Sequence, residues 1–182
     1  MKVLKSIYRF FKRVNDLRRS YFWCLFHGVE YKKGIYIGHH VKKDRSIKLF
    51  LSEQSRLSDN VMLWGSGPIK IGFSSSIGSW SRLYACDGFG IEIGNYVNAA
   101  SHLYIIDSNH GIKKGELIMS QPFSSKKVVI GNDVWFGYHV TVLPGVCLGN
   151  GVVCGACSVV TKSFPENAVI CGVPATIIKY RE

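Results

Sequence analysis

The sequence lacks the features that mark several other classes of protein. No apolar run approaches the roughly 20 residues that a membrane-spanning helix needs, and charges interrupt every apolar stretch near the start, which argues against a signal peptide. The six cysteines show no disulfide-framework spacing, so we expect them to be packing residues in a reducing compartment. Acidic residues are few, with 12 Asp and Glu against 23 Lys and Arg, and the formal net charge is +11. Together these features predict a compact, basic protein located in the cytoplasm.

A repeat of six residues organises the chain from Ile130 to Cys171. The first place of each hexad is apolar and the second is usually glycine. Successive hexads begin Ile130-Gly131, Phe136-Gly137, Val142-Leu143, Leu148-Gly149 and Cys154-Gly155. A helical period cannot produce this spacing, whereas a fixed short repeat is typical of a parallel β-helix whose stacked coils bury one continuous core. The pattern predicts an all-β solenoid over residues 34–182, with three hexads to each triangular coil.

The same repeat extends upstream and is broken by two insertions. Hexads that begin at Ile71-Gly72 and Ile93-Gly94 keep the pattern, while residues 37–38 and 57–63 predict weaker, irregular first coils. A few extra residues lie around 86–90. A longer insertion, from about 111 to 127, follows the hexad that ends at His110. Because an insertion leaves a solenoid as a loop, often on the functional face, we expect a protruding loop over residues 111–127.

The excess of positive charge is concentrated in residues 1–33, which hold nine Lys or Arg against two acidic residues. Apolar residues recur between Leu4 and Leu25 at helical spacing, so this segment is predicted to be a basic amphipathic helix. Such a helix could contact an anionic membrane surface through residues 1–27, at the inner face of the membrane, or it could cap the first coil, or do both. We expect no nucleic-acid partner, because the charge is local and no aromatic stacking motif accompanies it.

Four stretches of the repeat carry a family signature. They are Ile-Gly-Asn-Asp-Val-Trp-Phe-Gly at 130–137, Pro-Gly-Val at 144–146, Gly-Ala-Cys-Ser-Val-Val-Thr-Lys at 155–162 and Gly-Val-Pro-Ala at 172–175. They resemble the hexapeptide-repeat acyltransferases, above all sugar O-acetyltransferases of the galactoside, maltose, capsule and O-antigen type. The resemblance covers roughly residues 65–182. It implies a left-handed β-helix, acetyl-CoA as the donor, and a homotrimer with active sites between subunits.

The resemblance also implies a reaction, in which an acetyl group passes from acetyl-CoA to a hydroxyl of a sugar. The expected setting is the biosynthesis of a surface polysaccharide, such as a capsule, an O-antigen or an exopolysaccharide. A basic N-terminal helix would suit an acceptor held at a membrane, such as a lipid-linked glycan.

His110 is the predicted catalytic base. Transfer of an acyl group to a hydroxyl needs a base, and histidine suits this role near neutral pH. Of the six histidines, His110 alone ends a complete coil and directly precedes the long insertion. The catalytic base of the resembling family occupies the same place. Asp107, three residues earlier, could orient the imidazole as in a catalytic triad, or it could only bond to its own turn.

The resemblance places further residues at the donor and acceptor sites. The residues expected to contact CoA or lie beside it are Trp135, Tyr138, Ala156, Thr161, Lys162, Lys179 and Arg181. The lysines suit phosphate groups. The residues expected to contact the acceptor are Trp80, Tyr84, Asp87 and Asn109. Gly78 stands where relatives use an acceptor-binding Asn, so we expect a pocket that differs from that of the galactoside enzymes.

Other functions remain open for a β-helix of this kind. The acceptor could be a small molecule, such as an antibiotic, a free sugar or an amino acid. A zinc enzyme of the gamma-carbonic-anhydrase type would need three converging histidines. His102 and His110 are eight residues apart, which places them on different sides of a coil, so we expect no metal. A non-catalytic assembly role is the remaining alternative.

Overall fold

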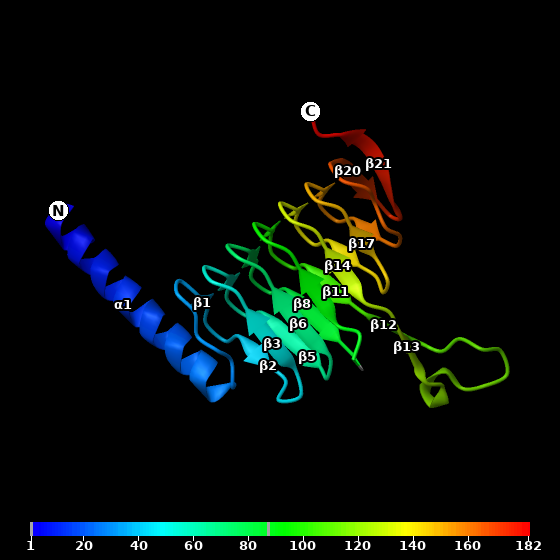
Figure 1. Ribbon diagram of the computed structural model, residues 1–182, viewed down its shortest axis with the longest axis horizontal. Coiled ribbons are helices and arrows are strands. Elements are labelled where there is room, and N and C mark those ends of the chain that lie inside the picture. Colours follow the sequence, from blue (N-terminus) through cyan, green and yellow to red (C-terminus); the bar gives the residue numbers. More distant parts are fainter. Residues whose placement is uncertain (1, 87) are drawn as a thin grey trace.

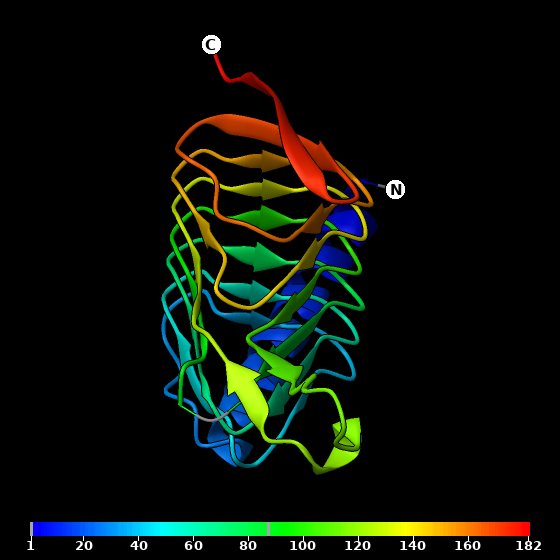
Figure 2. The same ribbon diagram turned by 90° about the vertical axis from the view of Figure 1, so that its right-hand side faces the viewer.

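The computed structural model describes residues 2–86 and 88–182 as one long helix followed by a triangular prism of stacked coils (Figure 1). The helix is α1 (Lys2–Phe26). The stacking of the coils is visible in Figure 2, where strands of equal direction lie above one another. The prism is the left-handed parallel β-helix that the hexads and the resemblance led us to expect.

The prism has three faces, each a parallel sheet. The first face contains β1 (Tyr36–Ile37), β4 (Arg56–Leu57), β7 (Ser76–Ile77), β10 (Asn98–Ala99), β15 (Trp135–Phe136), β18 (Val153–Cys154) and β20 (Ala168–Gly172), and the antiparallel β21 (Ala175–Tyr180) closes it. The second face contains β2 (Lys42–Lys43), β5 (Met62–Gly65), β8 (Arg82–Ala85), β11 (Tyr104–Ile106), β16 (Thr141–Val142) and β19 (Val159–Val160). The third face contains β3 (Lys48–Leu51), β6 (Pro68–Ile71), β9 (Ile91–Ile93), β14 (Val128–Ile130) and β17 (Cys147–Leu148).

Equivalent hexads pair in register along each face, so that the first-place side chains form one column inside the prism. Phe136, for example, lies between Ala99 and Cys154 and is fully buried. The first coils are regular, which corrects the expectation of irregular ones, because Ile37 pairs with Leu57 and Leu57 with Ile77. Their pattern was hard to read in the sequence because other residues replace glycine at the corners.

The chain turns from the third face to the first at a corner that we name the third–first corner. Asparagine side chains bridge successive coils there. Asn95 Oδ1 accepts a hydrogen bond from the Phe73 N–H, Asn132 Oδ1 from the Asn95 N–H, and Asn150 Oδ1 from the Asn132 N–H, each at 2.8 Å. Gly131 precedes Asn132, and a Cβ atom on it would lie 2.8 Å from the backbone of the next coil. Close stacking therefore explains the Gly-Asn pairs.

The C-terminal half of α1 covers the open end of the first coil. β1 is the outermost strand of the first face, so its peptide groups have no strand beneath them. The Ile37 N–H donates to Ser20 Oγ at 2.9 Å, Arg19 Nε donates to the Ile37 carbonyl at 2.9 Å, and Trp23 Nε1 donates to the Val41 carbonyl at 3.0 Å. The expectation that the helix caps the first coil is therefore confirmed for this half of it.

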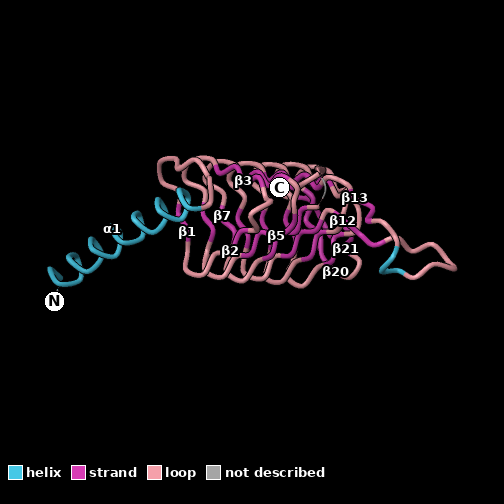
Figure 3. Tube along the Cα trace, turned by 90° about the horizontal axis from the view of Figure 1, so that it is seen from below, coloured by secondary structure: helices cyan, strands magenta, loops and turns pink. Residues whose placement is uncertain are grey.

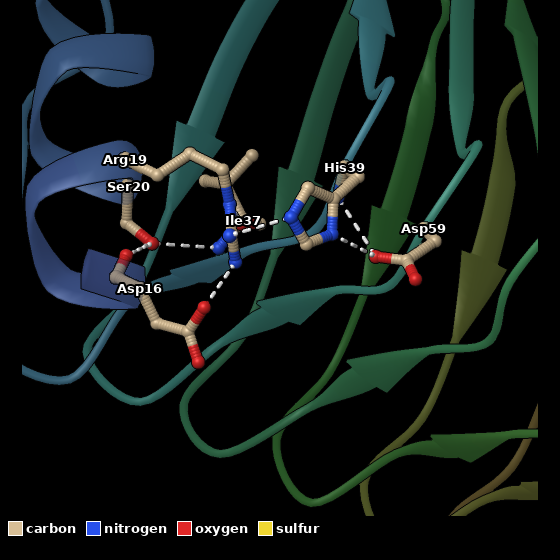
Figure 4. Close-up of polar contacts among 6 residues, drawn as sticks. All are labelled: Asp16, Arg19, Ser20, Ile37, His39 and Asp59. Carbon is tan, nitrogen blue, oxygen red and sulfur yellow. Dashed lines mark hydrogen bonds and ion pairs between the residues drawn. The ribbon is translucent and has the colours of Figure 1, made fainter. Parts of the chain in front are cut away.

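A small polar network fixes the angle of this cap (Figure 4). Asp16 forms an ion pair of 2.7 Å with Arg19, whose guanidinium also lies 3.0 Å from His39 Nε2. The backbone N–H of His39 donates to Asp59 at 2.7 Å and lowers the pKa of that carboxyl. The helix ends at Phe26, within the basic segment 1–33, because Gly28 adopts a left-handed conformation with φ of 63° and turns the chain toward the prism.

We predict that Ser20→Ala lowers the free energy of unfolding by about 1–3 kcal/mol, because the buried Ile37 N–H loses its acceptor. Urea unfolding followed by circular dichroism measures this loss. Ser6→Ala is the matched control, since Ser6 lies exposed on the same helix and the change in helix propensity is the same. Equal stability of the two variants would contradict the capping role.

Candidate functional site

His110 lies at the base of a ribbon that leaves the prism between the second and third faces, at the second–third corner. The ribbon consists of β12 (Ser108–His110) paired antiparallel with β13 (Phe123–Ser125), and the short helix η1 (Ile118–Ser120) lies between them. It projects far from the coils (Figure 1). The protruding loop is therefore present and begins as an ordered ribbon. The His110 side chain is exposed, and its ring centroid lies 4.4 Å from that of Phe123.

Asp107 ties the two insertions together. Its carboxylate is fully buried, with Oδ1 accepting from the Cys86 N–H at 2.7 Å and Oδ2 from the Gly90 N–H at 2.8 Å. Its carbonyl accepts from the Lys126 N–H at 2.7 Å, at the end of the ribbon. These bonds hold the short 86–90 insertion against the base of the ribbon. An orienting contact of Asp107 with the His110 ring stays a prediction.

Several of the predicted site residues share this corner with His110. Asn109 lies in β12 opposite Ser124 and is exposed. Tyr84 points outward from β8 beside Cys86, and burial, with that thiol contributing, raises the pKa of its phenol. Thr161 and Lys162 follow β19 at the same corner, two coils further along the prism, and both are exposed. Asp87, a predicted acceptor contact, lies outside the described residues.

Other predicted site residues lie elsewhere on the prism. Trp135 is 54% exposed on the first face, between Asn98 and Val153 of the neighbouring coils. Trp80, Tyr138 and Ala156 lie where the chain turns from the first face to the second, at the first–second corner. The first face is opposite the second–third corner of the triangle. Within one chain, the width of the prism therefore separates Trp135 from His110.

The first–second corner carries a column of rings, of which the sequence had singled out only Trp80 and Tyr138 as site residues. Trp80, His102 and His139 occupy equivalent places in successive coils, all with φ near 60°. The rings of Trp80 and His102 are nearly parallel with centroids 6.5 Å apart, and Tyr138 lies 5.2 Å from His102. The column borders a cavity of about 470 Å³. Equivalent corner residues of other coils, such as His40, Asn60 and Cys157, have the same positive φ, so this backbone belongs to the fold, and the rings are candidates for function because they gather beside the cavity.

One feature of the sequence could have pointed to His102 and His139, which is their hexad place, identical to that of Trp80. His102 and His110 lie at different corners, as their spacing predicts, so they do not converge on one site. His102 Nδ1 is buried without a hydrogen-bond partner among the described residues.

The last two predicted CoA contacts lie in the C-terminal strand and directly after it. Lys179 lies in β21 beside Val169 on the first face. Arg181 donates to Asp133 at 2.9 Å and to the Gly151 carbonyl at 3.2 Å, so its guanidinium fastens the C-terminal end to the third–first corner. Contact of either residue with CoA stays a prediction.

Burial makes two of the thiols poor nucleophiles. It raises the pKa of Cys24 to about 11 and that of Cys154 to about 12. Cys154 points into the core whereas Cys157 is exposed at the first–second corner, so the C-x-x-C pair does not face one site. The chemistry that the second–third corner offers is that of an exposed imidazole.

Known proteins resemble this chain in sequence and in fold. No family model matches the chain. The chain is 38% identical over 148 residues to the putative lipopolysaccharide biosynthesis O-acetyl transferase WbbJ of Escherichia coli (strain K12), covering 77% of this chain and 74% of that protein. It is 32% identical over 163 residues to the putative colanic acid biosynthesis acetyltransferase WcaF of the same organism, covering 90% and 75%.

A solved structure agrees with these relatives. A mutant of AntD, an N-acyltransferase from Bacillus cereus in complex with dTDP-4-amino-4,6-dideoxyglucose and coenzyme A, superposes with a TM-score of 0.69 at 26% identity, covering 82% of each chain. The fold and the relatives define an acyl-CoA-dependent acyltransferase. The chain belongs to the hexapeptide-repeat acyltransferase family and uses acetyl-CoA as its co-substrate.

We predict that Asp107→Asn lowers the thermal unfolding midpoint by several degrees, because an amide cannot accept at both positions where the carboxylate accepts from Cys86 and Gly90. If Asp107 only holds the insertions, the pH profile of kcat keeps its midpoint. A shift of that midpoint would instead show that Asp107 tunes the imidazole. Differential scanning calorimetry and the pH dependence of CoA release make the two measurements.

Proposed function

We propose that this acyltransferase transfers the acetyl group of acetyl-CoA to a sugar hydroxyl during the biosynthesis of a surface polysaccharide, with His110 as general base. The observation that carries the proposal is the exposed His110 imidazole, which lies where the ribbon leaves the prism. The buried Asp107 carboxylate holds that part of the chain in place. The relatives WbbJ and WcaF support the class of acceptor, because their names place them in lipopolysaccharide and colanic acid biosynthesis.

The proposed reaction is a direct transfer between two bound substrates. His110 removes the proton of the acceptor hydroxyl while the oxygen attacks the thioester carbonyl. The tetrahedral intermediate collapses, the carbon–sulfur bond breaks, and the imidazolium returns its proton to the departing CoA thiolate. A backbone N–H would stabilise the oxyanion. Thr161 and Lys162, which share the corner with His110, would hold the donor, with the lysine near a phosphate.

We further propose that the complete site forms between two copies of the chain in a homotrimer. Trp135 and the rings of the first–second corner lie across the prism from His110, so one chain cannot bring them to a single substrate. A neighbouring copy that packs its first face against the second–third corner would unite them. The exposure of Trp135 and of Tyr138, both about half, suits such a contact.

A second candidate is the transfer of an acyl group to an amine on a nucleotide-linked sugar. AntD, an N-acyltransferase bound to a nucleotide-linked amino sugar, favours it. The same imidazole could take a proton from an amine as it attacks the thioester. An assay that follows CoA release with hydroxyl-bearing and amine-bearing sugars, each free, nucleotide-linked or polymeric, separates the two candidates.

We predict that His110→Asn lowers kcat/KM for acetyl transfer by about 10²- to 10⁴-fold, which is the usual contribution of a positioned base, while the coils stay folded. CoA release measures the rate. His40→Asn is the matched control, because His40 lies exposed at the first–second corner of the first coil and asparagine tolerates its φ of 54°. Wild-type turnover in His110→Asn would remove His110 from the mechanism.

We predict that two inactive variants rescue one another if the site is shared. His110→Asn and Trp135→Ala are unfolded together, mixed equally and refolded. In a trimer with sites between subunits, about one quarter of the sites then combine an intact His110 with an intact Trp135 from the neighbour. Recovery of that share of CoA release is the expected result. If the mixture is no more active than its parents, the two residues do not serve one site between copies.

A further inference from the structure

The exposed side of α1 is apolar. Large apolar side chains that are 45% exposed or more follow one another along the helix, and they are Ile7, Tyr8, Phe10, Phe11, Leu17, Tyr21, Phe22, Leu25 and Phe26. The opposite side carries Ser20, Trp23 and Cys24, which pack on the first coil. The helix therefore presents its apolar side away from the prism, the reverse of a helix that covers a core.

Much of this apolar side lies beyond the prism. The N-terminal half of α1 extends past the first coil into open space (Figure 3). No helix of the described residues is long and apolar enough to cross a bilayer. A helix with one strongly apolar and one strongly basic side suits the plane of a membrane surface instead, where the apolar side enters the acyl boundary.

A basic cleft lies on the other side of the same helix, between α1 and the first coils. The cleft has a volume of about 380 Å³, and its cations are Arg9, Lys12, Arg13 and Arg56. The Arg56 guanidinium is held over the Tyr36 ring, 4.6 Å from its centroid. The cleft contains one carboxylate, Asp16, which is paired with Arg19. None of the four cations forms an ion pair within residues 2–86 and 88–182.

We propose that α1 and this cleft form a docking site for an anionic phospholipid bilayer. The apolar side of α1 enters the boundary between headgroups and acyl chains, and lipid phosphates occupy the cleft between α1 and Arg56. Arg18, exposed among the apolar side chains, reaches the phosphate layer with its long side chain. Neither element has a part in the acetyl-transfer mechanism, so the docking site is separate from the function proposed above.

Charge favours a bilayer over a second copy of the chain as the occupant. Each copy would bring its own cluster of Arg9, Lys12 and Arg13 to the contact, and like charges repel. The chain has 12 acidic residues, and six of those that the structure describes are already in ion pairs with its own cations or histidines. An anionic lipid surface supplies the missing negative charge and the apolar phase together.

Co-sedimentation of the full chain with lipid vesicles tests the proposal. We expect binding to vesicles of phosphatidylcholine with phosphatidylglycerol and much weaker binding to phosphatidylcholine alone. Raising the ionic strength from about 0.1 to about 1 M should weaken binding about tenfold or more, because the screening length falls from about 10 to about 3 Å. Equal binding to the two vesicle types would overturn the role of the cleft.

Two matched pairs of variants separate the parts of the site. Phe11→Glu should lower vesicle binding about tenfold or more, since it removes a large apolar group and adds a negative charge. Phe50→Glu makes the same change on the third face, where the Phe50 side chain is 54% exposed, against 60% for Phe11. This control variant should bind vesicles as the wild type does. Arg13→Gln should weaken binding to anionic vesicles, whereas Arg45→Gln, at the exposed corner after β2, should not.

The oligomeric state decides between the bilayer and a second copy. Sedimentation equilibrium without lipid should give the same mass for Phe11→Glu and Phe50→Glu, and thermal unfolding should show both variants folded. A lower mass for Phe11→Glu alone would mean that another copy covers the apolar side of α1. That result, or equal vesicle binding by the two glutamate variants, would overturn the proposal.

Discussion

In-register hydrogen bonding between successive coils is the constraint on which the rest of the structure depends. Because Ile37, Leu57 and Ile77 stack on the first face, every other hexad place is also stacked, including the places at the corners. The corners therefore become columns of equivalent side chains. One column is the asparagine ladder that ends at Asn150, and another is the set of rings at Trp80, His102 and His139. Side chains in these columns can differ from coil to coil without disturbing the core.

The two insertions depend on this regularity as well. They leave successive coils at one corner, so a single buried carboxylate, Asp107, reaches the backbone of both. A buried carboxylate is stable only when donors satisfy its oxygens. The need to satisfy Asp107 therefore fixes the 86–90 loop and the root of the ribbon relative to each other. His110 follows three residues later and takes its place from that junction.

The hexads allowed the solenoid and its breaks to be read directly from the sequence, because a first-place apolar residue followed by glycine has a strict period. The break after the coil that ends at His110 also located the corner where the ribbon leaves. The orientation of α1 on the prism could not be read from the sequence. Period alone shows that α1 is amphipathic but not which side meets the prism, since Ser20 and Arg19 decide this through bonds to Ile37.

The histidine column was missed for a related reason. Its place in the hexad has positive φ in successive coils and holds residues as different as His40, Asn60 and Cys157, so a histidine there has no pattern to distinguish it. The distance between Trp135 and His110 could not be read from the sequence, where they lie 25 positions apart with the long insertion between them. Only the closed triangle puts them on opposite sides.

The stacking of coils also sets a length. Three coil spacings separate the coil that α1 caps from the coil that carries His110, and neighbouring strands lie about 4.8 Å apart. The prism therefore places the imidazole about 14 Å from its capped end, measured along the stack of coils. A glycan fixed in a surface beneath α1 would have to extend over that length before its reacting hydroxyl met the base.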